Sequence, residues 1–344
     1  MQTSFISTLS LWNSPRTGLA KLQTELAKAN QEGVNGRHAD VGLALGSGVG
    51  LGIALRREME EIDGLKADNG LVSLRLSTTQ ASLQEMQKAA DSVLSSLVGT
   101  APGKRAAAIK EIAATQLSAL TASLNKASGG QYLFAGTNAQ QEPMADYADA
   151  AKAKVAKAFE DTFGFTRDDP RAASIGEADM AAFLDGAFAK LFDADGWKAN
   201  WSSASSQSLT SRISTTETAT TSTTANIEPV RILAMAYVMA SDLGATGMSG
   251  EVQTLVTDRV IALLGKASDG LVDVQAGLGR SQAMVTAANT RMNAQTALLA
   301  TQLNDLEGVD QQAAISRGQL IQQQIQVSYN LTSQLRQLSL VNYL

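Results

Sequence analysis

The stretch IDGLKADNGLVSLRLSTTQASLQEMQKAADSVLSSL, residues 62–97, carries a regular pattern of apolar side chains. The apolar positions form two series with a spacing of seven residues, and the second series lies three residues behind the first. This pattern predicts a long helix with a coiled-coil seam. The side chains that we predict to pack along this seam are Ile62, Leu65, Asn69, Val72, Leu76, Leu83, Met86, Val93 and Leu97.

A second seven-residue series lies near the other end of the chain. It predicts another long helix with a narrow apolar stripe, and a narrow stripe needs a partner. A shorter helix is predicted over residues 106–127, after the break GTAPG at 99–103. We therefore expect the two ends of the chain to meet in an antiparallel bundle. The residues of this second series are Leu271, Leu278, Val285, Met292, Leu299 and Leu306.

Asn69 is the polar member of the first series, and two interpretations stay open for it. A buried asparagine at a core position sets the register of paired helices at some cost in stability. Alternatively, Asn69 is a partly exposed residue without that role.

The middle of the chain, residues 131–227, differs in composition from both ends because it holds most of the aromatic side chains. A helix is expected over residues 177–192. The serine- and threonine-rich tract at 202–224 predicts short strands or an exposed loop. A buried helix over residues 228–243 leads back to the second series. We read this segment as a small mixed α/β insert that faces outwards.

The two extremities share a low charge and an approximate helical stripe. We call residues 1–45 and 309–344 the terminal arms. Because ordering about 30 residues costs on the order of 1–2 kcal/mol each for the backbone, we predict that the arms are disordered in the monomer and fold when neighbouring copies cover them. The arm side chains that we predict to make these contacts are Phe5, Leu9, Trp12, Leu19, Leu22, Leu26, Leu320, Val327, Leu331, Leu335 and Leu338.

The predicted fold is therefore mainly α. It is an elongated antiparallel helical rod, coiled-coil-like, made from residues 46–130 and 228–308, with the insert at 131–227 and the two arms beyond the rod.

Composition excludes several classes of function. The 344 residues include 28 basic and 33 acidic side chains without a basic block, which argues against a nucleic-acid binder. With no cysteine and one histidine, sulfur-based and multi-histidine metal sites are excluded. The glycine-rich apolar stretch at 42–55 is too short for a membrane span, and the first residues do not resemble a cleaved signal peptide. We expect no metal, no cofactor and no membrane insertion.

Four motifs invite a chemical interpretation, and each has a more ordinary one. The glycines at 46, 48, 50 and 52 do not match a dinucleotide loop and are read as a flexible joint before the long helix. Ser123 and Lys126 match the SxxK pattern of serine acylation, but the companion motifs are missing. His38 with Asp40 has no nucleophile beside it, and Asp193 to Gly196 is read as a turn rather than a calcium loop. We predict that the protein is not an enzyme.

Three segments resemble the bacterial flagellin superfamily. The sequence GGQYLFAGTNAQQEPM begins at Gly129, and its part QYLFAGTN, residues 131–138, is similar to the YLFAGT-type segment of the hook-filament junction proteins, or hook-associated proteins 3. The stretch 278–310 resembles the C-terminal core helix of the superfamily, and LTSQLRQLSLVNYL at 331–344 resembles its final assembly helix. GRHADVGLALG at 36–46 stands where many members carry an RINSxxDDPA-like stretch and is similar to the variant of alpha-proteobacterial, rhizobial members.

The resemblance implies a structural protein of the bacterial flagellum. It implies a junction adaptor on which flagellin assembles, exported through the flagellar type III channel without a cleaved signal and located outside the cell. The implied partners are hook-associated protein 1 on the hook side, flagellin on the filament side, neighbouring copies in a ring, and an export chaperone on the C-terminal arm. Because the stretch at 36–46 departs from the usual pattern, a self-polymerising filament flagellin stays open as the alternative.

Overall fold

A computed structural model describes residues 8–243 and 247–341, with side chains described for residues 16–110, 112–149, 151–243 and 247–334. The chain divides into two compact units, which we call the end unit (Met1–Gly64 with Met292–Leu344) and the central unit (Leu65–Arg291). Helices dominate both units, which confirms the prediction of a mainly α chain with antiparallel helices and a small mixed insert. The boundaries of the units fall inside two long helices, so the predicted segmentation at residues 45, 130, 227 and 308 stays a prediction.

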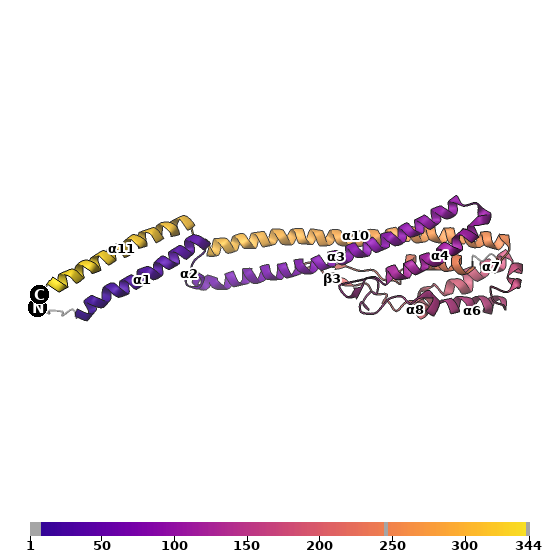
Figure 1. The fold of residues 1–344 in the computed structure, drawn as a ribbon, viewed down its shortest axis with the longest axis horizontal. Helices are drawn as coiled ribbons and strands as arrows, with labels where there is room; N and C mark the ends of the chain where they lie inside the picture. Colours follow the sequence, from indigo (N-terminus) through magenta and orange to yellow (C-terminus); the bar gives the residue numbers. More distant parts are fainter. Residues whose placement is uncertain (1–7, 244–246, 342–344) are drawn as a thin grey trace. The chain divides into compact units, whose positions relative to one another are not determined.

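The end unit is built from both extremities of the chain. Its two arm helices, α1 and α11, pack along one another, as Figure 1 shows in indigo and yellow. In this structure α1 and α11 are helical, and each covers an apolar face of the other. That the arms are disordered in the free monomer and fold when neighbouring copies cover them stays a prediction. The elements of the end unit are α1 (Thr8–Asn35), α2 (Val41–Leu45), the 3-10 turn η1 (Gly46–Gly48), the start of α3 (Val49–Gly99), the end of α10 (Gly250–Glu307) and α11 (Gln311–Val341).

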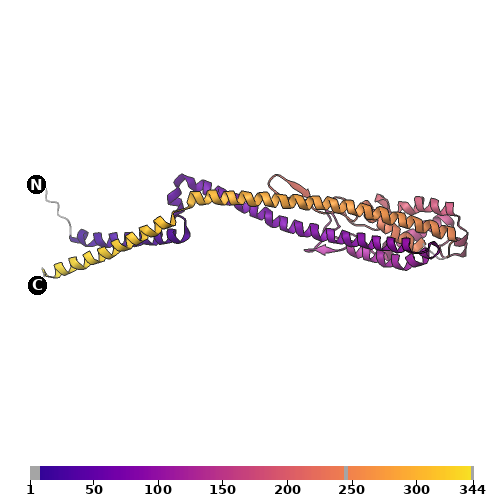
Figure 2. The same cartoon turned by 90° about the horizontal axis from the view of Figure 1, so that it is seen from above.

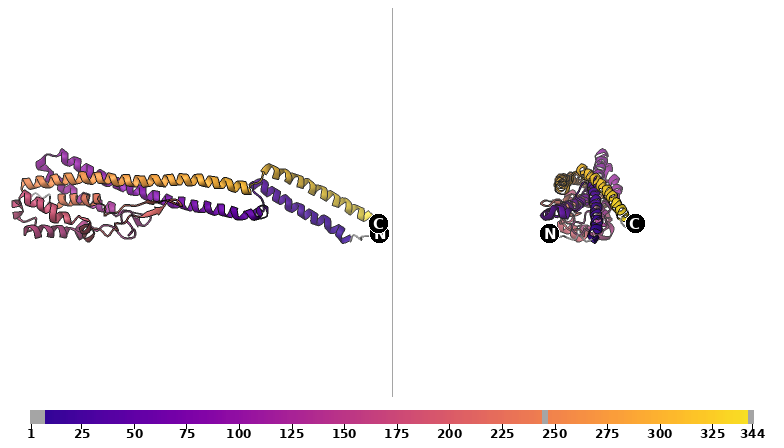
Figure 3. Two further views of the ribbon diagram at one scale, coloured as in Figure 1. Left: turned by 180° about the vertical axis from the view of Figure 1, so that it is seen from behind. Right: turned by 90° about the vertical axis from the view of Figure 1, so that its left-hand side faces the viewer.

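In the central unit, α3 and α10 run antiparallel. Residue numbers rise along one helix as their hydrogen-bonded partners fall along the other: Asn69 bonds Asn289, Gln87 bonds Gln275, and Asp91 bonds Ser268. Figures 2 and 3 show these helices side by side from above and from behind. Members of both seven-residue series enter one buried core, namely Leu76, Leu83, Met86, Val93, Leu97, Leu271, Leu278 and Val285.

Two further helices close this core. Helix α4 (Pro102–Leu124) begins with proline at its first turn, where the missing N–H costs nothing. It packs against α9 (Glu228–Val238) and the π-helical turn η4 (Met239–Leu243) that continues it. The predicted helices at 106–127 and 228–243 are therefore present with small shifts of their ends.

The insert is mixed, as predicted, with two antiparallel strand pairs. The predicted helix at 177–192 is interrupted by a π-helical turn. The elements are β1 (Ala127–Ser128) paired with β2 (Gln131–Tyr132), α5 (Tyr147–Ala150), α6 (Lys152–Phe163), the 3-10 turn η2 (Pro170–Ser174), α7 (Glu177–Phe183), the π-helical turn η3 (Leu184–Phe188), α8 (Ala194–Asn200), and β3 (Thr210–Arg212) paired with β4 (Thr218–Thr220).

The serine- and threonine-rich tract is not the exposed loop that we allowed for. It forms the β3–β4 hairpin, and its last four residues, 221–224, are buried. Their hydroxyl groups can be buried because they find partners: the N–H of Leu209 donates to Oγ of Ser222 at 2.7 Å. Composition alone could not show these long-range hydrogen bonds.

Candidate functional site

The arm helices carry the first candidate surface. A small core between α1 and α11 contains Ala29, Ile321 and Ile325, with Leu19, Leu22 and Leu26 packed against it. Of the α1 residues that we predicted, Leu19, Leu22 and Leu26 thus lie at the pair's interface. On α11, however, sequence reasoning missed Ile321 and Ile325, which recur four residues apart and belong to a stripe of mostly small residues.

The predicted α11 residues lie on a different face of that helix. Leu320, Val327 and Leu331 are 57%, 56% and 54% exposed, and we call these three side chains the outer stripe. Helix α11 therefore has two apolar faces, one covered by α1 and one open to solvent in this chain. Phe5, Leu9, Trp12, Leu335 and Leu338 lie outside the side chains that the structure describes.

A groove opens on the paired arms beside the outer stripe. It has a volume of about 600 Å³ and a mostly apolar lining that includes Leu19, Leu22 and Leu331. Exposed glutamines, among them Gln319, Gln323 and Gln326, share the surface of α11 with the outer stripe. The outer stripe and these glutamines are uncharged and can be covered without desolvating ions, which suits contact with another protein. The groove itself also has two charged lining residues, Lys21 and Glu25.

The glycine-rich segment before the long helix is not the flexible joint that we predicted at residues 46–52. Helix α3 already begins at Val49, so Gly50 and Gly52 are helical rather than part of a flexible link. The non-helical backbone lies earlier, at residues 36–40, where Gly36 has a φ of 65°; Gly46, between α2 and η1, has a φ of 50°. His38 lies in this segment, and its Nδ1 is 3.9 Å from Oε1 of Glu32.

In the packed helices, Asn69 proves to be buried and not partly exposed. Its Nδ2 donates to the backbone O of Ile213 and to Oδ1 of Asn289, both at 2.8 Å. Asn69 therefore connects α3 both to α10 and to the turn of the β3–β4 hairpin.

The other predicted packing residues differ in burial. In the end unit the buried ones are Ile62, Met292 and Leu299, whereas Leu65, Val72 and Leu306 are only half-buried.

We expect Asn69→Ala to lower the free energy of unfolding by about 1–3 kcal/mol, because it leaves the buried backbone O of Ile213 and the half-buried Oδ1 of Asn289 without their donor. The exposed Asn293 on α10 provides the control, and Asn293→Ala should change stability by less than about 0.5 kcal/mol. Urea denaturation followed by circular dichroism measures both. Equal stability of the two variants would show that the Asn69 bonds contribute nothing.

The segment QYLFAGTN, residues 131–138, crosses from the helices into the insert. Leu133, Phe134 and Ala135 are fully buried. The backbone of the segment pairs with the end of the serine- and threonine-rich tract, since the N–H of Ala225 donates to O of Phe134 at 2.8 Å. Arg75 of α3 donates to the O of Tyr132 at 2.9 Å, and its partial burial lowers its pKa. The segment is thus a structural wedge between α3 and the insert, and Gly136 within it has a φ of +62°.

The other chemical motifs have structural explanations. Lys126 forms an ion pair with Glu85 of α3 at the surface, so it is not poised on Ser123. Oδ1 of Asp193 accepts the N–H groups of Asp195 and Gly196 at 3.1 and 2.7 Å and thereby caps α8. A capped turn was the reading that the sequence favoured.

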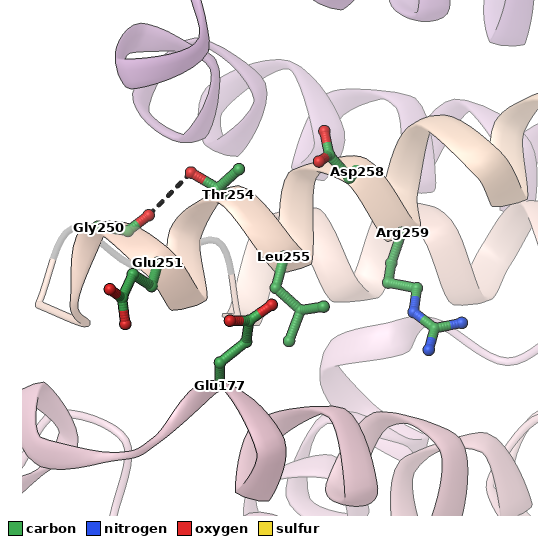
Figure 4. A pocket seen from close by; sticks show the side chains of 7 residues that line it. All are labelled: Glu177, Gly250, Glu251, Thr254, Leu255, Asp258 and Arg259. Carbon is green, nitrogen blue, oxygen red and sulfur yellow. Dashed lines mark hydrogen bonds between the residues drawn. The ribbon is translucent and has the colours of Figure 1, made fainter.

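Several cavities of the central unit are lined in part by charged side chains. One, of about 500 Å³, is drawn in Figure 4, where Glu177 of α7 faces Glu251 and Leu255 of α10. In another, the Tyr147 hydroxyl donates to Oδ2 of Asp242. Burial and the Asp242 carboxylate both raise the pKa of Tyr147 well above its usual range.

Among the described residues, no group of three or more acidic or histidine side chains could hold a metal ion. Nor is any helix in the described ranges long and apolar enough to cross a membrane.

Paired terminal helices, long antiparallel helices and an inserted mixed domain define a helical structural subunit whose two chain ends fold together. Comparison with protein families identifies it more closely. Residues 6–139 match the bacterial flagellin N-terminal helical region, and residues 261–344 match the bacterial flagellin C-terminal helical region. These matches cover more than half of the chain, and the chain belongs to the bacterial flagellin family. It is a structural component of the flagellum, exposed outside the cell. A search of curated proteins finds no match to this chain.

Proposed function

We propose that the protein is the hook-filament junction adaptor, on which flagellin assembles. The observation that carries the proposal is the segment QYLFAGTN at 131–138, which is similar to the corresponding segment of junction proteins. In this chain the segment is part of the packed core, because Leu133, Phe134 and Ala135 are fully buried and Leu133 and Phe134 join the main apolar cluster. The similarity of GRHADVGLALG at 36–46 supports the further proposal that the protein is of the alpha-proteobacterial type.

The proposed partners are neighbouring copies in a ring, hook-associated protein 1 on the hook side, flagellin on the filament side, and an export chaperone that holds the C-terminal arm in the cytoplasm. The open outer stripe and the exposed glutamines beside it support contacts of the arms with other subunits. Contacts between successive subunits of such an assembly would be heterologous, each surface meeting a different one. Export through the flagellar type III channel would place the chain outside the cell.

Deletion of the gene in a flagellated host tests this function. A junction adaptor predicts that hooks remain, filaments are lost and flagellin appears in the culture medium. Complementation with the intact gene should restore filaments. Unchanged motility after deletion would overturn the proposal.

The alternative is a filament flagellin, and the match of both chain ends to the flagellin regions favours it equally. A filament subunit should polymerise alone into long fibres when the purified protein is seeded or salted out. A junction adaptor should stay monomeric under the same conditions. Electron microscopy of the purified chain therefore distinguishes the two functions.

A further inference from the structure

Glu307, the last residue of α10, is a buried carboxylate with charged partners from two other segments. Its side chain is 2% exposed. One oxygen, Oε2, accepts Nη2 of Arg37, from the segment after α1, and Nη2 of Arg56, from α3. Both arginines are nearly half exposed, so their other donors stay hydrated while the carboxylate does not. A buried carboxylate without its cations is strongly disfavoured.

A glycine leaves room for the Glu307 side chain, and the neighbouring backbone adds hydrogen bonds. A side chain at Gly52 would place its Cβ 3.2 Å from Oε1 of Glu307, so glycine leaves the room that the carboxylate occupies. The backbone reinforces the same contact, because the N–H of His38 donates to O of Glu307 at 3.1 Å and the N–H of Val309 donates to O of Gly36 at 3.0 Å. Three segments of the end unit therefore meet at one residue.

A second buried carboxylate lies on the other side of the same segment. Glu32 of α1 is 8% exposed. Its Oε2 accepts Nη2 of Arg317, from α11, and its Oε1 accepts the N–H of Ala39 at 3.2 Å. Residues 37–39 thus contact both carboxylate residues: Arg37 and His38 bond Glu307, and Ala39 bonds Glu32. Arg317 connects Glu32 to the C-terminal arm.

We propose that the ion pairs of Glu32 and Glu307 form cooperatively and act as a two-part ion-pair lock. The backbone of the joint is then either fully ordered or fully disordered. The joint, residues 36–40 with 307–310, adopts its structure only when Arg37, Arg56 and Arg317 have all engaged. Because one short segment serves both carboxylates, opening one part of the lock displaces the partners of the other. The lock thereby couples the pairing of the two arms to the end of the long helices.

Hydrogen exchange of the full-length chain at single-residue resolution tests the coupling. Glu307→Gln keeps the shape of the side chain and removes its charge. We expect exchange of the His38 and Val309 N–H groups to accelerate at least tenfold. The decisive amide is that of Ala39, which is bonded to Glu32 and not to Glu307. It should accelerate by a similar factor. Arg56→Gln should have the same effect at a smaller amplitude.

Glu58→Gln is the matched control. Glu58 also connects α3 to α10, accepting Nε2 of Gln295 at 2.7 Å, but it is exposed. It should leave exchange at the joint unchanged. If amide exchange accelerates only at His38 and Val309 in Glu307→Gln, the two ion-pair clusters are independent and the proposal is wrong. The proposal is also wrong if Glu58→Gln accelerates exchange at the joint as much as Glu307→Gln does. If Glu307→Gln accelerates exchange throughout the chain, including the central unit, the milder variant Arg56→Gln is used in its place. The test is again whether the Ala39 amide accelerates together with those of His38 and Val309. The measurement uses the purified monomer, so it is independent of whether the protein is a junction adaptor or a filament subunit.

Discussion

Gly136→Ala is expected to lower the free energy of unfolding by about 2–5 kcal/mol. The backbone φ of +62° disfavours any side chain by roughly 1–2 kcal/mol. An added Cβ would also lie 2.5 Å from the backbone O of Gln207 and 2.6 Å from that of Ser205, closer than atoms can approach. These backbone atoms cannot rotate away as a flexible side chain can. Relieving the overlap therefore costs about 1–3 kcal/mol more, and it breaks the bond from the Thr137 N–H to O of Gln207.

Gly164→Ala separates the two contributions. Gly164 ends α6 in the same insert with a φ of +78°, but no atom lies within 4 Å of its would-be Cβ. This variant should lose only the roughly 1–2 kcal/mol of backbone strain. Urea denaturation followed by near-ultraviolet circular dichroism, which detects the packed aromatic core of the insert, measures both variants. A Gly136→Ala variant that is no less stable than Gly164→Ala would contradict the wedge role of residues 131–138.

The second large effect is expected on assembly and not on folding. Replacing the outer stripe by Leu320→Ser, Val327→Ser and Leu331→Ser should abolish filament growth in a complemented deletion strain, because it removes the apolar surface that other subunits would cover. Each side chain is already more than half exposed. The isolated chain should therefore lose no more than about 0.5 kcal/mol per site through helix propensity. Motility on soft agar and electron microscopy of the flagella give the readout.

Two comparisons make this result specific. A triple variant of neighbouring exposed positions, Gln319→Ser, Gln323→Ser and Gln326→Ser, should still support filaments. Ile321→Ala with Ile325→Ala, on the face that α1 covers, should instead loosen the pairing of the arms in the monomer. Normal filaments with the outer-stripe variant would exclude this stripe from the assembly interface and leave the groove at Leu19 and Leu22 as the remaining candidate.

Sequence periodicity predicted the helices better than it predicted their polar contacts. The seven-residue series located α3 and the part of α10 from Leu271 onwards, because burial of one stripe is dictated by the geometry of the helix itself. It missed the part of α10 before Leu271, where Val252, Val256, Val260 and Leu264 are buried. The same reasoning selected Leu320, Val327 and Leu331 as the contacts of α11. That these three side chains contact neighbouring copies stays a prediction. The sequence did not reveal that Ile321 and Ile325 pack against α1, since a helix with two apolar faces does not show which face a given partner covers.

Spacing and composition predicted most of the helices, the meeting of the two chain ends and the mixed insert between them, because each segment carries its pattern independently of the rest. Three features emerge only from the folded chain: Asn69 bonds the turn of a distant hairpin, residues 221–224 are buried, and Glu307 binds both Arg37 and Arg56. A polar group accepts any of several partners, and which one it meets depends on long-range packing that no local pattern encodes.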